Sequence, residues 1–171
     1  MDNSILKQWP IYENPDLGIR FQYPSVFANP GLETKITNGV SVNWVAMTGS
    51  TPDQSFPIRS LVLGVTEQGQ SDNLEAEIKK ADGPNPADPQ DPRNRAAEFH
   101  WSKISIDGID ALKAVYQRLN IPINGRMESI SSVVTCGFYW NKKHYGLALT
   151  GDPDGESVMD QIIASFSFLK K

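Results

Sequence analysis

Few side chains in this sequence could act as a nucleophile, a general base or a soft metal ligand. It contains one cysteine, Cys136, and two histidines, His100 and His144. A cysteine nucleophile needs a histidine within hydrogen-bond reach. His100 lies between Phe99 and Trp101, at the end of an expected strand, and nothing in its spacing brings it to Cys136. The same three residues are a thin ligand supply for zinc, because no close pair of histidines is present.

The distance between Cys136 and His144 depends on the turn of an expected hairpin. If Lys142 and Lys143 form a two-residue turn, Asn141 pairs with His144. Five residues along a strand, about 16 Å, then separate His144 from the position opposite Cys136. We therefore expect Cys136 to be a small buried apolar residue rather than a nucleophile.

An acidic, glycine-rich segment follows this hairpin. Residues 151–156 read Gly-Asp-Pro-Asp-Gly-Glu, like the start of a calcium loop. Ile163 stands where the bidentate glutamate of such a loop should be, so we expect the acids to cap a helix instead. The alternative is a divalent-metal site, for zinc or calcium, formed by His144, Asp152 and Asp154.

The remaining motifs and the composition exclude several function classes. There is no glycine-rich phosphate loop, no dinucleotide fingerprint and no Gly-x-Ser-x-Gly elbow. The 171 residues carry a formal net charge of −4, which does not suit a nucleic-acid binder built on broad electrostatics. No cofactor is implied, and we expect a protein that is not an enzyme.

Two segments are candidate surfaces for binding a partner. Residues 82–95 contain four prolines, which forbid helix and central strand, and so long a loop is often functional or disordered. The second segment is the basic tip of the hairpin, which suits an acidic partner surface. The candidate contact residues are Asp88, Asp91, Arg93 and Arg95 in the loop and Lys142, Lys143 and His144 at the tip.

The elements that must position these residues follow from hydrophobic periodicity. Alternating or β-branched runs predict strands, and helix-period runs predict helices. Strands are expected at 18–23, 32–36, 40–47, 58–66, 101–106, in a long hairpin over 129–150, and at 166–168. Helices are expected at 73–81, with Ser71 or Asp72 as N-cap, and at 157–164. Residues 111–119 fit a helix face and a strand alternation equally well.

Three segments, in order, resemble the PsbP-like family. Residues 12–24 read YENPDLGIRFQYP, similar to the string that enters the first strand of those domains. Residues 104–111 read ISIDGIDA and resemble the hairpin of the family. The chain closes with YGLAL at 145–149, a glycine- and aspartate-rich turn, a helix, and IASFSF at 163–168.

The resemblance implies an α+β fold, an α/β/α sandwich with a central antiparallel β-sheet. A returning strand follows the Asp107-Gly108 turn in that pattern, so the resemblance assigns 111–119 to a strand. We expect one domain over 1–171, with the proline-rich loop at 82–95 as an insertion.

The resemblance also implies binding rather than catalysis. Plant members are extrinsic subunits of photosystem II, cyanobacterial relatives are lipid-anchored lumenal proteins, many other bacterial members are exported lipoproteins, and a eukaryotic branch binds the Ran GTPase. The sequence shows neither a lipobox cysteine nor the basic N-terminal region of the plant members. We expect a monomeric binding or assembly domain with a protein partner, which could belong to a membrane complex. We expect it to be exported or thylakoid-lumenal if a signal or anchor was removed, and otherwise cytoplasmic. The alternative function is binding of a small ligand or a divalent metal.

Overall fold

The computed structural model describes residues 9–27, 34–36, 39–47, 58–81, 95–119 and 130–169. In this part, the chain forms a seven-stranded antiparallel sheet of order β3-β4-β5-β9-β8-β7-β6 and a three-stranded sheet of order β1-β2-β10. The strands are β1 (Ile11–Asn14), β2 (Ile19–Gln22), β3 (Thr34–Ile36), β4 (Gly39–Met47), β5 (Ile58–Glu67), β6 (Arg95–Ile106), β7 (Ile109–Leu119), β8 (Ile130–Trp140), β9 (Lys143–Thr150) and β10 (Ser167–Phe168). The helices are α1 (Leu74–Ala81) and α2 (Gly155–Ser165).

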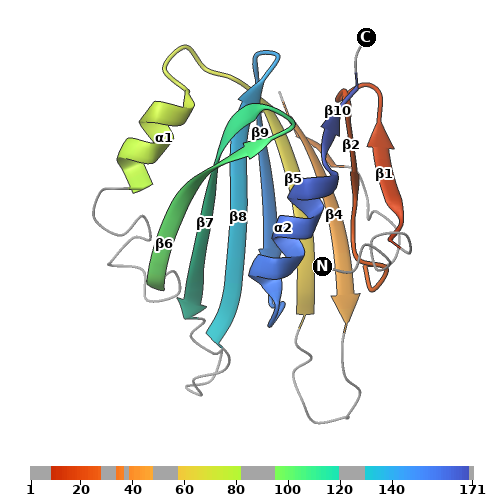
Figure 1. Ribbon diagram of the computed structural model, residues 1–171, viewed down its shortest axis with the longest axis vertical. Coiled ribbons are helices and arrows are strands. Elements are labelled where there is room, and N and C mark those ends of the chain that lie inside the picture. The colour runs from red at the N-terminus through yellow and green to blue at the C-terminus, as the bar shows by residue number, and fades with distance from the viewer. Residues whose placement is uncertain are drawn as a thin grey trace.

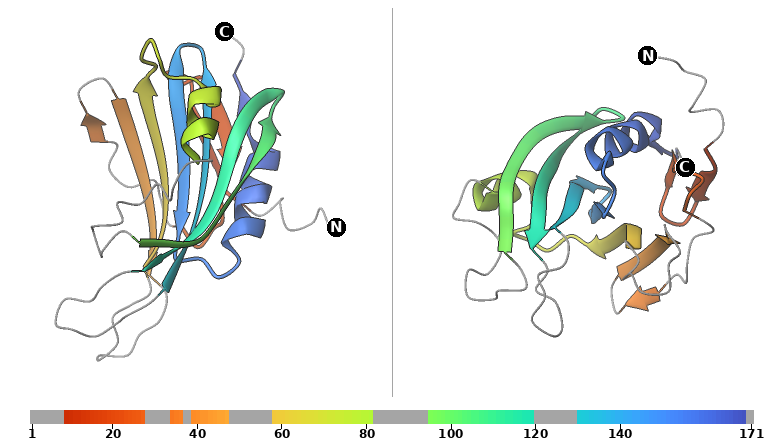
Figure 2. Two further views of the ribbon diagram at one scale, coloured as in Figure 1. Left: turned by 90° about the vertical axis from the view of Figure 1, so that its left-hand side faces the viewer. Right: turned by 90° about the horizontal axis from the view of Figure 1, so that it is seen from below.

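The elements are arranged in layers around the large sheet. The sheet curves around α2, the small sheet lies beside α2 on the same face, and α1 lies on the outer face (Figure 1, Figure 2). This arrangement confirms the predicted α+β class with a central antiparallel sheet between helical layers. It also confirms that residues 111–119 are strand, because they form most of β7.

The core lies between the large sheet and the layer of α2 and the small sheet. Strand residues of one parity face it, which is the result of period-2 alternation in half-buried strands. Aromatic rings fill its centre: Phe21 stacks on Phe166 at 5.4 Å between ring centroids, and Phe138 stacks on Tyr145 at 5.1 Å. The helix expected over 157–164 is confirmed by α2, whose Met159 and Ile162 are buried against this core.

The register of the long hairpin differs from the prediction. Trp140 pairs with Lys143, so the turn residues are Asn141 and Lys142, and His144 lies opposite Tyr139. Both turn residues have positive φ, 50° and 61°. A two-residue hairpin turn of this type requires two left-handed residues, and asparagine adopts that conformation more readily than most. The preference of Asn141 therefore places the turn one residue earlier than predicted.

Two element boundaries also differ from the prediction. The N-cap of α1 is Asn73, whose Oδ1 accepts a hydrogen bond from the Ala76 amide at 2.9 Å, and not Ser71 or Asp72. Asp72 Oδ2 instead accepts a hydrogen bond from the Gly69 amide at 3.0 Å, which closes the preceding turn. Arg95 is the first residue of β6, where it pairs with Leu119, and not the last residue of a loop.

Candidate functional site

The tip of the β8–β9 hairpin is the predicted partner-binding segment that the structure describes. Asn141 and Lys142 are exposed at its apex, and Lys143 is half-buried at its base. The other tight hairpin turn, between β6 and β7, has glycine at its second position, with Asp107 at φ 46° and Gly108 at φ 83°. The β8–β9 turn has Lys142 at that position, where a side chain costs about 1–2 kcal/mol.

His144, the third residue assigned to the tip, points to α1 on the outer face. Its Nε2 lies 3.2 Å from Oε1 of Glu77, and the Tyr139 hydroxyl donates to the same oxygen at 2.8 Å. Burial acts to raise the pKa of Glu77, but the contacts with His144 and Tyr139 outweigh it, and the net pKa is lowered. Burial and the neighbouring carboxylate raise the pKa of Tyr139 far above its ordinary value. The structure thus separates His144 from Lys142 and gives it a role in fastening α1.

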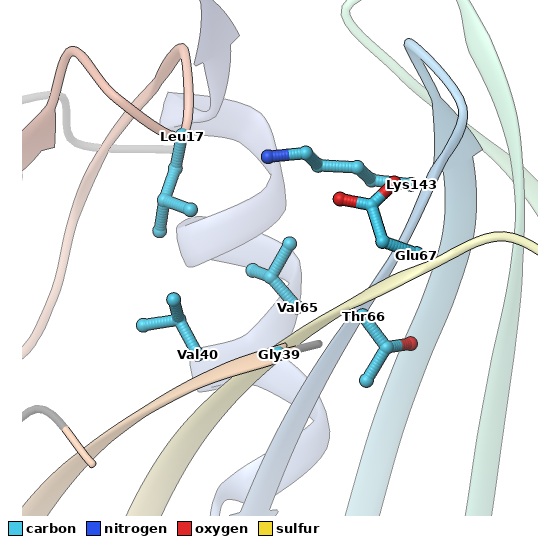
Figure 3. Close-up of a pocket in the computed structure, with 7 residues that line it drawn as sticks. All are labelled: Leu17, Gly39, Val40, Val65, Thr66, Glu67 and Lys143. Atoms are coloured by element: carbon cyan, nitrogen blue, oxygen red, sulfur yellow. The ribbon is translucent and has the colours of Figure 1, made fainter. Parts of the chain in front are cut away.

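A small pocket opens next to Lys143. Its lining residues are Leu17, Gly39, Val40, Val65, Thr66, Glu67 and Lys143, and we call it the Leu17 pocket. Its volume is about 110 Å³. The apolar side chains of Leu17, Val40 and Val65 converge on it, and Lys143 extends across it with its ammonium group toward Leu17 (Figure 3). Sequence reasoning missed this pocket because its residues come from segments far apart in the chain.

One wall of the Leu17 pocket is a turn within residues 12–24, the first of the three segments that resemble the PsbP-like family. The Leu17 amide donates to Oδ1 of Asn14 at 3.0 Å, and the Tyr145 hydroxyl donates to the Leu17 carbonyl at 2.8 Å. Gly18 has φ 69°, and a Cβ there would lie 2.9 Å from the ring of Trp140. Asparagine, glycine and these aromatic partners therefore hold Leu17 in one place.

Tyr145 is an inner support of this site. Burial, with a smaller contribution from the Glu67 carboxylate, raises the pKa of Tyr145 to about 12. Its hydroxyl therefore remains protonated even in alkaline solution and keeps its hydrogen bond to the turn.

The three residues of the alternative metal site do not come together. His144 is the second residue of β9, and Asp152 follows the other end of that strand, so about 26 Å of extended chain separates them. Asp152 is buried, lies 3.5 Å from the Arg59 guanidinium, and accepts the Asp154 amide at 2.9 Å. Asp154 is the N-cap residue of α2 but makes no side-chain capping bond. The predicted side-chain cap of α2 is therefore absent, and Asp152 instead orders the turn before the helix. Among the described residues, no cluster of three or more histidine, cysteine and carboxylate side chains could hold a metal ion.

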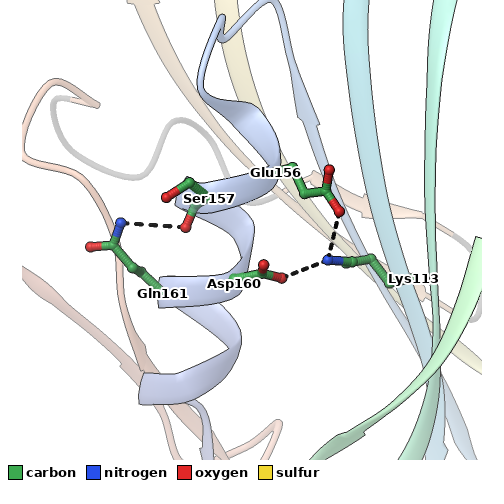
Figure 4. Close-up of polar contacts among 5 residues, drawn as sticks. All are labelled: Lys113, Glu156, Ser157, Asp160 and Gln161. Atoms are coloured by element: carbon green, nitrogen blue, oxygen red, sulfur yellow. Dashed lines mark hydrogen bonds and ion pairs between the residues drawn. The ribbon is translucent and has the colours of Figure 1, made fainter. Parts of the chain in front are cut away.

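A buried lysine between β7 and α2 was not predicted. Lys113 Nζ donates to Glu156 at 3.0 Å and to Asp160 at 2.8 Å (Figure 4). Burial acts to lower the pKa of Lys113, but its two carboxylate partners outweigh it, and the net pKa is raised. The indication in the sequence was that Lys113 lies two residues after Ala111, so that both side chains point to the same face of the strand. This network fastens α2 to the sheet.

The remaining candidate residues have different outcomes. Cys136 is fully buried, and burial raises its pKa to about 12, so it is an inert core residue as predicted. It faces the core next to Phe138, whereas His144 faces the outer side of the sheet. Asp88, Asp91 and Arg93 lie outside the described residues. No helix in the described part of the chain is long and apolar enough to cross a membrane.

Comparisons with known proteins show the fold. No model of a known protein family matches this chain, and no curated protein matches its sequence. The solution structure of cyanobacterial PsbP (CyanoP) from Synechocystis sp. PCC 6803 is similar, with a TM-score of 0.56, 14% identity and coverage of 98% of this chain and 96% of that one. The Ran-binding protein Mog1p from Saccharomyces cerevisiae matches with a TM-score of 0.52, 7% identity and coverage of 95% and 96%.

A third solved structure, from Bacteroides thetaiotaomicron VPI-5482, matches with a TM-score of 0.55 and 15% identity over 96% of this chain. The present chain spans 50% of that longer one. At these identities the likeness shows the Mog1p/PsbP-like fold, and this is the fold of the chain.

Proposed function

We propose that this chain is a non-enzymatic binding or assembly domain, which docks the tip of its β8–β9 hairpin on an acidic surface of a partner protein. The observation that carries the proposal is the conformation of Lys142. This residue is exposed at the apex of the turn with φ 61°, a position where glycine would be unstrained. A strained residue at an exposed apex points to a role in function.

The surroundings of Lys142 support a contact surface. The Lys142 carbonyl accepts a hydrogen bond from the Gln68 amide at 2.9 Å, so the turn is fastened to the end of β5. Its ammonium group therefore projects from a rigid base, which lowers the entropic cost of binding. Lys143, whose ammonium group extends across the Leu17 pocket, adds positive potential at the base of the tip, and charge of one sign selects a complementary surface and speeds association.

The similar proteins fit a binding function. Mog1p is a Ran-binding protein, so the same fold presents a protein-binding surface in that case. More specifically, we propose an exported or thylakoid-lumenal protein of bacterial or cyanobacterial origin. We further propose that it belongs to the PsbP-like family and is associated with photosystem II. Residues 82–94 are the second contact segment of this proposal.

The experiment compares partner capture by two matched pairs of charge reversals. Lys142→Glu with Lys143→Glu alters the tip, and Lys79→Glu with Lys80→Glu alters an exposed lysine pair on α1. Each protein is immobilised, exposed to solubilised membranes of its native cell, and the bound proteins are quantified at low and high salt. We expect the tip variant alone to lose the salt-sensitive partner. Equal capture by both variants would contradict the proposal.

A deletion within residues 82–94 tests the loop segment in the same assay. Capture that is unchanged by this deletion would remove the loop from the proposed contact surface. The deletion leaves the tip intact, so the two segments are tested separately.

A small-ligand function is the second candidate, because the Leu17 pocket is a preformed cavity with charged groups at its opening. The metal-binding form of this alternative finds no ligand cluster among the described residues, and a thermal shift with zinc, calcium or manganese tests it. A ligand at 100 times its dissociation constant adds ~2.7 kcal/mol to stability, and no shift at millimolar metal would end the metal form.

A further inference from the structure

We propose that the Leu17 pocket binds a small aliphatic α-amino acid. The side chain of the ligand fills the space between Leu17, Val40 and Val65. Its carboxylate contacts the Lys143 ammonium group and its own ammonium contacts the Glu67 carboxylate.

The size of the pocket fits a branched aliphatic group. Its volume is about 110 Å³. An apolar protein cavity of about 150 Å³ binds benzene, so a pocket of this smaller volume suits an isobutyl or isopropyl group. Its floor is apolar, since Leu17 and Val65 are buried and Val40 is half-buried beside them. A leucine or valine side chain would gain its binding free energy from this floor.

The two charges at the opening specify a zwitterion. Glu67 on β5 and Lys143 on β9 are directly paired across the sheet, at the end where its core-facing side meets solvent. In the described part of the chain, neither forms an ion pair with the other or with any other residue. Glu67 would repel a simple carboxylate ligand, and Lys143 would repel a simple amine. A ligand with both charges on one carbon satisfies both groups.

The pocket is held in its open shape by the protein itself. The turn that carries Leu17 is fastened by the Asn14 side chain, by the Tyr145 hydroxyl and by a hydrogen bond from the Leu169 amide to the Gly18 carbonyl at 2.8 Å. On the other wall, Gly39 lies so close to β5 that an added Cβ would be 2.8 Å from the Val65 carbonyl oxygen. A ligand therefore does not need to order these walls when it binds.

The test is a titration of the ¹⁵N-labelled protein with L-leucine, followed by NMR amide shifts. Two analogues accompany it: 4-methylpentanoate, which lacks the ammonium group, and 3-methylbutylamine, which lacks the carboxylate. We expect saturable shifts at Leu17, Val40 and Val65, and about tenfold weaker binding of each analogue.

Variants assign the two charges. Lys143→Gln and Glu67→Gln should each weaken L-leucine binding about tenfold. Lys142→Gln is the matched control, because it removes the same charge one residue away without touching the pocket, and its affinity should equal that of the parent. This control also separates the pocket from the proposed partner-binding tip, which requires Lys142.

Three results would overturn the proposal. These are no saturable shift at the pocket residues, equal affinity for L-leucine and 4-methylpentanoate, or Lys143→Gln binding as tightly as Lys142→Gln. The amide spectrum reports directly whether each variant is folded. If a variant does not fold, the comparison of the three ligands on the parent protein decides the question.

Discussion

Replacement of Lys142 by glycine should stabilise this protein. Lys142 has φ 61° in a two-residue turn whose first residue, Asn141, has φ 50°. A residue with a Cβ pays about 1–2 kcal/mol in the left-handed conformation, and glycine does not. Glycine also makes the unfolded chain more flexible, which costs about 0.4–1 kcal/mol. The difference is a gain of about 0.5–1 kcal/mol in the free energy of unfolding.

The gain is measurable by thermal and urea unfolding. For a chain of this length, 1 kcal/mol moves Tm by about 2–4 °C, so Lys142→Gly should raise Tm by about 1–4 °C. The hydrogen bond from the Gln68 amide to the carbonyl of residue 142 involves only backbone atoms and is retained. The substitution hardly alters the surface area that unfolding exposes, so the slope of the urea curve should be the same for the variant and the parent.

A matched control separates turn strain from flexibility. Asn141→Gly places glycine one position earlier, where asparagine already tolerates the left-handed conformation, and should yield a smaller gain. A Lys142→Gly protein no more stable than the parent would refute the reasoning from strain. If Lys142 is strained for function, the same variant should also capture less partner while being more stable.

Four further outcomes follow from the packing and the ionisable groups. Gly18→Ala should destabilise the protein by about 2 kcal/mol or more in urea unfolding, because its φ of 69° disfavours a side chain and the Cβ would meet the Trp140 ring at 2.9 Å. The pKa of Lys113 is raised in the fold, so its contribution is complete below the ordinary lysine value of 10.5 and is lost as pH rises through the raised pKa. Lys113→Met should therefore flatten the fall in unfolding free energy above pH 10.5, and an unchanged slope would contradict this. The pKa of Glu77 is lowered from 4.5, so its contribution to the free energy of unfolding is present above that value and is lost as pH falls through the lowered pKa. Glu77→Gln should therefore flatten the acid limb of the curve of unfolding free energy against pH. Cys136 should resist iodoacetamide at pH 8 in the native protein and react at the rate of unfolding, and rapid native labelling would show that it is not buried.

The large sheet could be predicted because its strands carry their pattern locally. Val40 to Met47 and Ile58 to Glu67 alternate or are β-branched, and each forms a long strand. The segment 111–119 could not be assigned by periodicity, since its apolar spacing fits both a helix and a strand. Its place beside β8 in the sheet decides its structure, and the ordered family pattern anticipated this.

The register of the hairpin depended on a single turn. Hydrophobic alternation determines which face of the sheet each side chain occupies, but a shift of two residues in the pairing leaves every side chain on the same face. Cys136 was therefore placed correctly in the core although its partner is Leu147. The signal that could have fixed the register is the left-handed preference of Asn141.

The candidate site could be predicted only in part. Lys142 at the tip followed from local sequence. The Leu17 pocket, the contact between His144 and Glu77, and the ion pairs of Lys113 join residues that are far apart in the chain. Such contacts depend on how sheet and helices pack, and no local pattern encodes them.

The most direct test of the proposed function is the capture of partners from native membranes by the two charge-reversal pairs. The pair at Lys142 and Lys143 alters the hairpin tip, and the pair at Lys79 and Lys80 makes the same change of charge on α1. We predict that the salt-sensitive partner is lost with the tip pair and retained with the helix pair. Retention of that partner by both pairs, with both proteins folded, would contradict a hairpin-tip binding function.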